Sequence, residues 1–180
     1  MKKSIIILFS LLMLCACSKE DFDAYQLSNG EASYSDSALN GSGSAGKNAF
    51  KDFCVESFDT DGNGLVSRDE AAVVESIDCS GKDLTSLDGI GAFTSLKTLI
   101  CDNNALTTLD LTLTPNLTSL SCKGNLISVL DIRGIALSSL HCSPMKDASG
   151  NNVLRYIWLR RGQAVADLDV PDETLLIEMP

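Results

Sequence analysis

Oxygen-bearing residues recur at short intervals between positions 59 and 70, and their spacing suits the binding of a metal ion. Calcium is a hard cation that takes six to eight oxygen ligands from carboxylates, side-chain amides, backbone carbonyls and water. The residues that can supply such oxygens are Asp59, Asp61, Asn63, Leu65 through its backbone carbonyl, Ser67 and Glu70. Gly64 stands among them, where the chain must turn sharply to wrap an ion. We therefore expect this segment to bind calcium.

The same segment resembles the EF-hand calcium loop. That loop has carboxylates at positions 1, 3 and 12, a backbone carbonyl at 7, a ligand often reached through water at 9, and glycine at 6. Residues 59–70 match at each of these positions. Only one such loop occurs, so the chain alone cannot form the paired loops of calcium sensors. We expect a structural site with a Kd of about 10⁻⁴ to 10⁻³ M, as in extracellular modules. A regulatory switch and an acidic turn that binds nothing are the alternatives.

An entering helix must position this loop. The apolar residues upstream recur at helical spacing, which predicts a helix of about ten residues. These residues are Ala49, Phe50, Phe53, Cys54 and Phe58. Residues 71–74 would form a short exit turn. We interpret residues 48–73 as one N-terminal cap built from a helix and an EF-hand-like loop.

From residue 74 onward the pattern LxxLxC occurs four times. The units begin at Val74, Leu96, Leu117 and Leu137, and their cysteines are Cys79, Cys101, Cys122 and Cys142. Spacings of 22, 21 and 20 residues between these cysteines fall within the period of leucine-rich repeats. Two units continue as that family does, with Asn104 and Leu106 in one and Asn125 and Ile127 in the other. The chain from about residue 50 to 180 resembles the internalin-like short repeats of Bacteroidota surface lipoproteins. This resemblance implies an α/β solenoid of about 4–5 repeats with a parallel β-sheet on its concave face.

Such repeats must stack in order to fold. One unit buries four or five aliphatic side chains at about 1.5–3 kcal/mol each, against a backbone entropy cost of about 1–2 kcal/mol per residue. No unit is stable alone, so the stack needs a cap at each end. We assign residues 74–161 to the solenoid, with a last LxxLxL strand through Leu154, Ile157 and Leu159, and residues 162–180 to a C-terminal cap.

The strand residues between the inward positions form a face that can bind a partner. Its first four rows are small and polar, whereas the last row, with the residue after it, consists of Tyr156, Trp158, Arg160 and Arg161. Aromatic and arginine side chains are enriched at binding hot spots. We expect a partner on the concave face, which is a protein of a host or neighbouring cell. The alternative is a glycan-binding protein whose aromatic rings stack on sugar rings, or an accessory lipoprotein of an outer-membrane or periplasm-facing assembly. These rings could instead simply cover the open end of the stack.

Catalytic groups are not clustered in the sequence. His141 adjoins Cys142, but consecutive strand residues point to opposite faces and cannot form a nucleophile and base pair. We therefore expect no enzymatic activity. The repeat cysteines replace inward leucines and should form a buried ladder, in which a disulfide between neighbouring strands is conceivable. Residues stacked in a line do not converge on a zinc ion.

The N-terminal residues predict export and lipidation. Lys2 and Lys3 precede an apolar run over residues 5–14, which is shorter than the ~20 residues of a spanning helix. The following Leu-Cys-Ala-Cys resembles a lipobox, which implies a signal peptide over residues 1–16 and a lipid on Cys17. Cys15 is the rival acceptor, and an ordinary secretory signal is the other alternative.

The residues after the lipobox predict a surface location. Residues 18–21 resemble the export tag of Bacteroidota surface lipoproteins, so we expect an outer-membrane protein that faces the cell exterior. Residues 17–47 are rich in small polar residues and form a tether, which would span about 30 Å at 5–6 Å times the square root of its length. The formal net charge is −10, which argues against a nucleic-acid partner.

Overall fold

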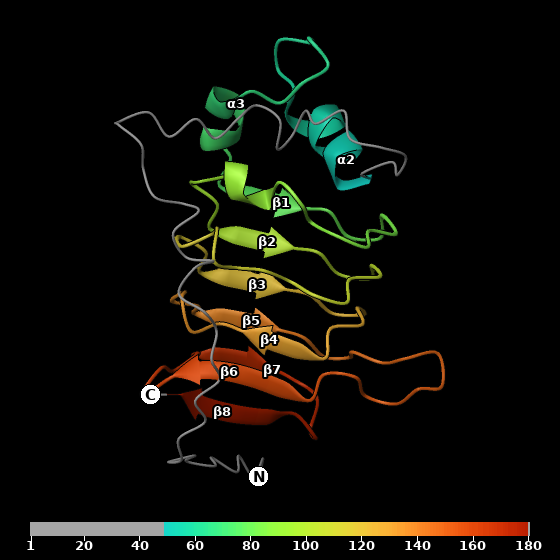
Figure 1. Ribbon diagram of the computed structural model, residues 1–180, viewed down its shortest axis with the longest axis vertical. Helices are drawn as coiled ribbons and strands as arrows, with labels where there is room; N and C mark the ends of the chain where they lie inside the picture. The colour runs from blue at the N-terminus through green and yellow to red at the C-terminus, as the bar shows by residue number, and fades with distance from the viewer. Residues whose placement is uncertain (1–48, 180) are drawn as a thin grey trace, which may run out of the picture.

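The LxxLxC segments form one parallel β-sheet in the computed structural model of this chain, which describes residues 49–179. Its strands, in spatial order, are β1 (Ser76–Asp78), β2 (Thr98–Ile100), β3 (Ser119–Ser121), β5 (Ser139–His141) and β7 (Asp167–Asp169). The pairs align the central aliphatic residue of each strand with that of the next, as in Leu99 with Leu120. Figure 1 shows these strands as successive rungs along the long axis. The predicted solenoid with a parallel sheet is thus confirmed.

The core of the solenoid is a column of inward side chains. In β1, β2, β3 and β5 the middle residue is buried, whereas its two neighbours are half-buried or exposed. The leading leucines and the cysteines of the repeats are also buried, among them Leu96, Leu117 and Cys122. Each turn covers the apolar side chains of the turn before it, which explains why no single repeat is stable by itself.

Two buried asparagines join consecutive turns. The Asn125 side chain is fully buried, and its Nδ2 donates to the carbonyls of Cys101, Cys122 and Lys123 at 2.9, 3.0 and 3.2 Å. Its Oδ1 accepts from the Leu106 amide at 3.0 Å. Asn104 makes the equivalent contacts one turn earlier. These side chains satisfy backbone groups that the tight turns would otherwise leave buried without partners.

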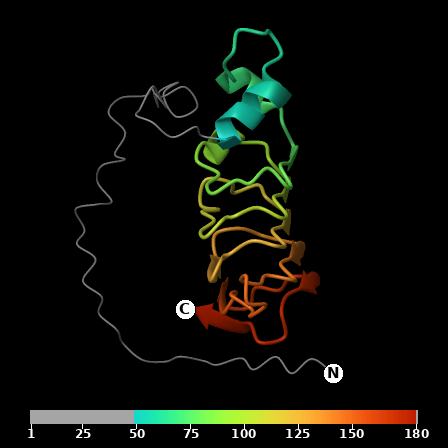
Figure 2. The same cartoon turned by 90° about the vertical axis from the view of Figure 1, so that its right-hand side faces the viewer.

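A second parallel sheet lies on the opposite side of the stack (Figure 2). Its order is β4 (Val129–Asp131), β6 (Tyr156–Arg160) and β8 (Leu175–Met179). The register aligns Val129 with Tyr156 and Leu175. The expectation that Tyr156, Trp158 and Arg160 form the last row of the concave face is therefore wrong. Asp167 and Asp169 of β7 occupy that row.

An inserted loop accounts for this error. Consecutive strands of the first sheet are 20 to 22 residues apart, but Ser139 and its partner Asp167 are separated by 28. The extra residues form a loop between β5 and β6 that projects from the stack (Figure 1). Its tip is folded on Asp147, whose Oδ1 accepts from the amides of Ser149 and Asn151 at 2.8 and 2.9 Å. The insertion delays the next strand of the first sheet until β7.

Two short helices lie at the N-terminal end, where one helix and an exit turn were predicted. They are α2 (Ala49–Phe58), which matches the expected entering helix, and α3 (Arg68–Ala72), which begins inside the acidic loop. A 3-10 helix, η2 (Ile90–Ala92), follows in the first repeat. Phe58 of α2 packs edge-on against buried Phe93, with ring centroids 5.4 Å apart. Aromatic packing thereby fixes the helix on the first turn of the solenoid.

The C-terminal residues do not form a separate cap. Within residues 162–179, β7 extends the first sheet and β8 extends the second. The inward side chains of this last turn, Leu168 and Leu176, remain half-buried and pack against the core. No helix among residues 49–179 is long and apolar enough to cross a membrane. The predicted signal peptide, lipidated Cys17 and tether lie outside the described residues.

Candidate functional site

The acidic loop brings three of its predicted metal ligands together. One carboxylate oxygen from each of Asp59, Asp61 and Glu70 lies within 4.8 Å of the others. Glu70 Oε1 accepts hydrogen bonds from the Thr60 hydroxyl and amide, both at 2.6 Å. The last ligand position of the loop is thereby held against the first ones, as the binding of one cation by both ends requires.

Local hydrogen bonds hold Glu70 in its charged form. Its carboxylate accepts from the Thr60 hydroxyl, from the Ser67 amide and hydroxyl, and from the Thr60 amide, and these bonds lower the pKa of Glu70 to about 2. Ser67 and Glu70 also form a capping box at the start of α3. The carboxylate is therefore ionised, as a calcium ligand must be, throughout the neutral and mildly acidic pH range.

The remaining loop residues support the same geometry. Gly64 has a φ of +84° and its amide donates to Asp59 Oδ2 at 2.7 Å. The Asn63 side chain turns to Asp61, donating from Nδ2 to Oδ2 at 2.8 Å. Its Oδ1 accepts from the Leu65 amide at 2.8 Å. The left-handed backbone at Gly64 fits the sharp turn expected at this position of the loop.

Two aromatic side chains lie on the second sheet, where Tyr156 is exposed and Trp158 is half-buried. We define the aromatic face as the outward side of β4, β6 and β8, formed by Val129, Asp131, Tyr156, Trp158, Arg160, Leu175, Ile177 and Met179. Tyr156 and Trp158 are the only tyrosine and tryptophan among the described residues. Tyr156 is 38% exposed and its neighbour Val129 is 37% exposed. The corresponding positions on the five-stranded sheet are mostly serine, threonine, aspartate and histidine.

Arg133 orders one part of this face and was not singled out from the sequence. It donates from Nε and Nη2 to the two carboxylate oxygens of Asp131 at 2.9 and 2.6 Å. Its guanidinium lies 5.2 Å from the Trp158 ring centroid. An open hollow of about 410 Å³ adjoins it, lined in part by Leu111, Ile135 and Arg160. The face thus combines a held arginine, an aromatic ring and a concave edge.

Two further arginines border the aromatic face. Arg160 and Arg161 are exposed at the end of β6, and neither side chain forms an ion pair with another residue of the described chain. The chain has a net charge of −10. Because Arg160 and Arg161 form no ion pair with its carboxylates, they can pair with an anionic partner.

The repeat cysteines form the predicted buried ladder. Cys79, Cys101, Cys122 and Cys142 are fully buried, and Cys54 of α2 extends the row. All five are free thiols. Burial raises the pKa of both Cys54 and Cys79 to about 12. The Sγ atoms of Cys122 and Cys142 are 3.4 Å apart, which is a thiol contact and not a bond. The thiols serve as small apolar core groups.

Comparison with solved structures supports this repeat architecture. The chain is similar to the functional domain of InlJ from Listeria monocytogenes, which includes a cysteine ladder, with 31% identity and a TM-score of 0.51. The match covers 72% of this chain and 30% of that chain. The chain has a leucine-rich-repeat fold. It spans about a third of the length of this neighbour. No family model and no curated protein matches the chain.

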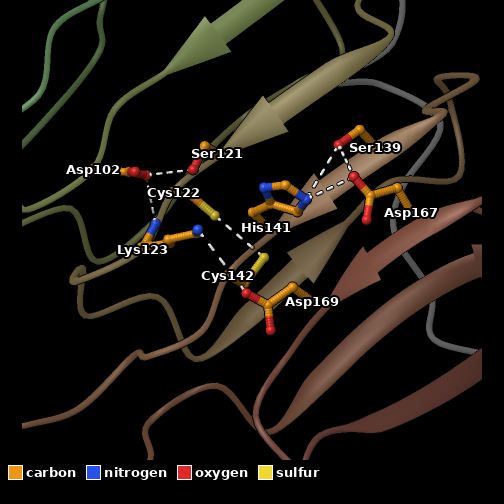
Figure 3. A network of polar contacts seen from close by, with 9 residues as sticks. All are labelled: Asp102, Ser121, Cys122, Lys123, Ser139, His141, Cys142, Asp167 and Asp169. Atoms are coloured by element: carbon orange, nitrogen blue, oxygen red, sulfur yellow. Dashed lines mark hydrogen bonds and ion pairs between the residues drawn. The ribbon is translucent and has the colours of Figure 1, made fainter.

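On the five-stranded face of the leucine-rich repeats, polar side chains bond across the strands (Figure 3). His141 Nε2 lies 2.9 Å from Asp167 Oδ2, and Ser139 Oγ contacts both groups at 3.4 and 3.1 Å. The carboxylate and the hydroxyl share one ring nitrogen. A catalytic triad instead places the carboxylate and the hydroxyl on separate ring nitrogens. His141 and buried Cys142 point to opposite faces, as expected.

A sequence signal for the true position of β6 was present. The first half of each of the first four repeats ends in cysteine, whereas second halves such as Leu106 to Leu111 and Ile127 to Ile132 end in an aliphatic residue. The segment Leu154 to Leu159 follows the second pattern, and Val165 to Val170 fits the first with valine in place of cysteine. The aliphatic end of Leu154 to Leu159 agrees with the second sheet, but Val170 is aliphatic too, so the last inward residue alone does not decide between the two sheets.

Proposed function

We propose that this chain is a lipid-anchored leucine-rich-repeat protein of the cell surface that binds a protein partner, mediating protein–protein interaction or adhesion. The observation that carries the proposal is the aromatic face, where Tyr156 and Trp158 lie beside Arg160 and Arg161. Interface hot spots are enriched in these residue types. The similarity to InlJ, a leucine-rich-repeat protein, agrees with a protein partner in general.

A protein fits the aromatic face better than a glycan does. Sugar rings stack on an open aromatic surface, whereas the Trp158 ring already has the Arg133 guanidinium 5.2 Å from its centroid. The aliphatic side chains of Val129, Leu175 and Ile177 continue the face beyond the rings. An extended apolar surface with arginines at its border is typical of a protein interface.

Calcium is proposed to act as a structural ion in the N-terminal cap. Asp59, Asp61 and Glu70 would supply carboxylates, Asn63 and the Leu65 carbonyl the intermediate oxygens, and Ser67 the position often reached through water. The ion would tie the loop between α2 and α3, and so would fix the cap on the first repeat. A single loop supports a structural site more than a regulatory one.

The membrane anchor is proposed to be a lipid on Cys17. The motif before it and the acidic residues that follow support an outer-membrane lipoprotein that faces outward. The segment between Cys17 and α2 would then hold the aromatic face away from the bilayer, where it can meet a partner on another cell.

Binding to intact cells tests the proposal. A fluorescently labelled chain of residues 18–180 would be applied to cells of the producing culture and to epithelial cells, each untreated, protease-treated or periodate-treated. Trp158→Ala and Tyr156→Ala would be compared with Thr98→Ala, a matched change at a half-buried outward position of the other sheet. We expect saturable binding that is lost with the first two variants and after protease, but survives periodate and Thr98→Ala.

The opposite pattern would decide against it. Loss after periodate alone would favour the glycan alternative. Binding that is indifferent to Trp158→Ala and Tyr156→Ala would show that the aromatic face is not the site.

A further inference from the structure

The last described turn of the solenoid has two strand edges without a neighbour among residues 49–179, and the two edges differ in character. Among the described residues, β7 ends the first sheet and β8 ends the second (Figure 1). The β7 edge is three residues long and carries Asp167 and Asp169, a charged and short edge of the kind that prevents strand addition. The β8 edge is five residues long, and four of its residues are apolar. Glu178 is the single charged residue of β8, and it is half-buried.

The hydrogen-bonding groups of β8 are ordered for a further strand. The Leu175 amide donates to the Arg155 carbonyl at 2.9 Å, and the Met179 carbonyl accepts from the Arg161 amide at 3.1 Å. Bonding alternates along a strand, so Leu175, Ile177 and Met179 face β6 with their backbone groups. The amides and carbonyls of Leu176 and Glu178 therefore point away from β6, towards the open edge.

From this geometry we propose that β8 pairs with β8 of a second copy of this chain in an antiparallel dimer. A two-fold axis through Ile177 sets Leu175 opposite Met179 of the other copy on the outward side. It also sets Leu176 opposite Glu178, and these two are the residues whose backbone groups are free. Each such pair exchanges two hydrogen bonds, as the close pairs of an antiparallel ladder do. No like charges face each other along this edge.

Charge complementarity favours a second copy over an unrelated strand. Exposed Asp172 and Glu173 precede β8, while Arg160 and Arg161 lie beside its end at Met179. Antiparallel pairing brings the acidic start of one strand to the basic end beside the other. Arg160 and Arg161 have no ion pair within the described chain, so the second copy would supply their missing carboxylates.

The β7 edges determine which strand mediates the contact. A two-fold pair of β7 strands would bring Asp167 of one copy towards Asp169 of the other, which is repulsive. Association is therefore through β8, and the sheet of β4, β6 and β8 continues into its counterpart. Both aromatic faces then point to the same side, so one dimer presents two binding surfaces. The inference goes beyond the proposed function and stands without it, because the size of the chain in the absence of any partner tests it.

Sedimentation velocity of residues 18–180, which contain every described residue, tests the dimer. We expect a concentration-dependent dimer for the unaltered chain. Ile177→Lys places two like charges at the two-fold axis and should weaken dimerisation by about tenfold or more. Val129→Lys, on the outward side of the far strand of the same face, should leave it unchanged. Circular dichroism would verify that both variants keep the fold.

A charge exchange gives a second test that does not depend on Ile177. The double variants Arg160→Glu with Arg161→Glu and Asp172→Arg with Glu173→Arg should each dimerise weakly alone and should form a mixed dimer together. A monomer at every concentration would overturn the proposal. It would equally be overturned by a dimer that survives Ile177→Lys, or by double variants that fail to associate when mixed.

Discussion

Calcium should raise the thermal stability of this protein through the acidic loop. Three carboxylate oxygens within 4.8 Å repel one another when no cation is bound, and a bound ion removes that repulsion. An ion that binds only the folded chain stabilises it by RT ln(1 + [L]/Kd). With ~5 mM calcium and a Kd of about 10⁻⁴ to 10⁻³ M, the gain is ~1.1 to 2.3 kcal/mol. For a domain of this size the melting temperature should rise by about 3 to 10 °C.

The assay is thermal unfolding of residues 18–180 followed by circular dichroism, with calcium and with chelator. Asp59→Asn keeps an oxygen that accepts from the Gly64 amide but removes one charge from the cluster. Its melting temperature should show no calcium response and should equal or exceed that of the unaltered chain in chelator. Asp69→Asn changes a nearby acidic residue outside the ligand positions and serves as the matched control, with a full calcium response.

Two results would refute this reasoning. Identical curves for the unaltered chain with and without calcium would reduce the loop to a capped turn. An undiminished calcium shift in Asp59→Asn would place the ion elsewhere in the protein.

Three further predictions concern the core and the anchor. Asn125→Ala leaves several buried backbone groups without partners and should cost ~3 kcal/mol or more in urea unfolding, whereas Asn116→Ala, which removes one exposed bond, should cost less than ~1 kcal/mol; similar losses for both would contradict the role of the buried asparagine. Because burial raises the pKa of Cys54 and Cys79 to about 12, these thiols should resist iodoacetamide at pH 8 until the chain is unfolded; rapid modification of the folded chain, read by mass spectrometry, would disprove this. Labelled palmitate should enter the protein in cells and be lost with Cys17→Ser but not with Cys15→Ser; the reverse result would move the lipid to Cys15.

The sequence predicted the repeat architecture because one inward pattern repeats with nearly constant spacing. A residue such as Leu99 or Cys101 can be buried at its position only if the neighbouring turn presents the same pattern. The acidic loop was equally readable, since ligand spacing and glycine position are local properties. The helix before the loop followed from the helical spacing of its apolar residues, and the start of the solenoid followed from the first LxxLxC segment.

The placement of Tyr156 and Trp158 was harder to predict. Their strand has the inward spacing of either half-repeat, and the choice between the two sheets depends on the length of the loop before it. Arg133 was missed for a related reason. Its contact with Trp158 joins positions 25 residues apart in sequence and arises only when β4 and β6 pair. The unpaired edge of β8 is likewise a property of the assembled sheet.

The most direct test of the proposed function is site-specific photo-crosslinking in living cells. A photoreactive phenylalanine analogue would replace Tyr156 on the aromatic face, or Thr98 on the five-stranded sheet, in the full chain. We predict that irradiation links position 156, and not position 98, to a second protein of defined mass. A defined adduct from position 98 alone, or none from position 156 under conditions in which the cells bind the labelled chain, would contradict the assignment of the aromatic face as the binding surface.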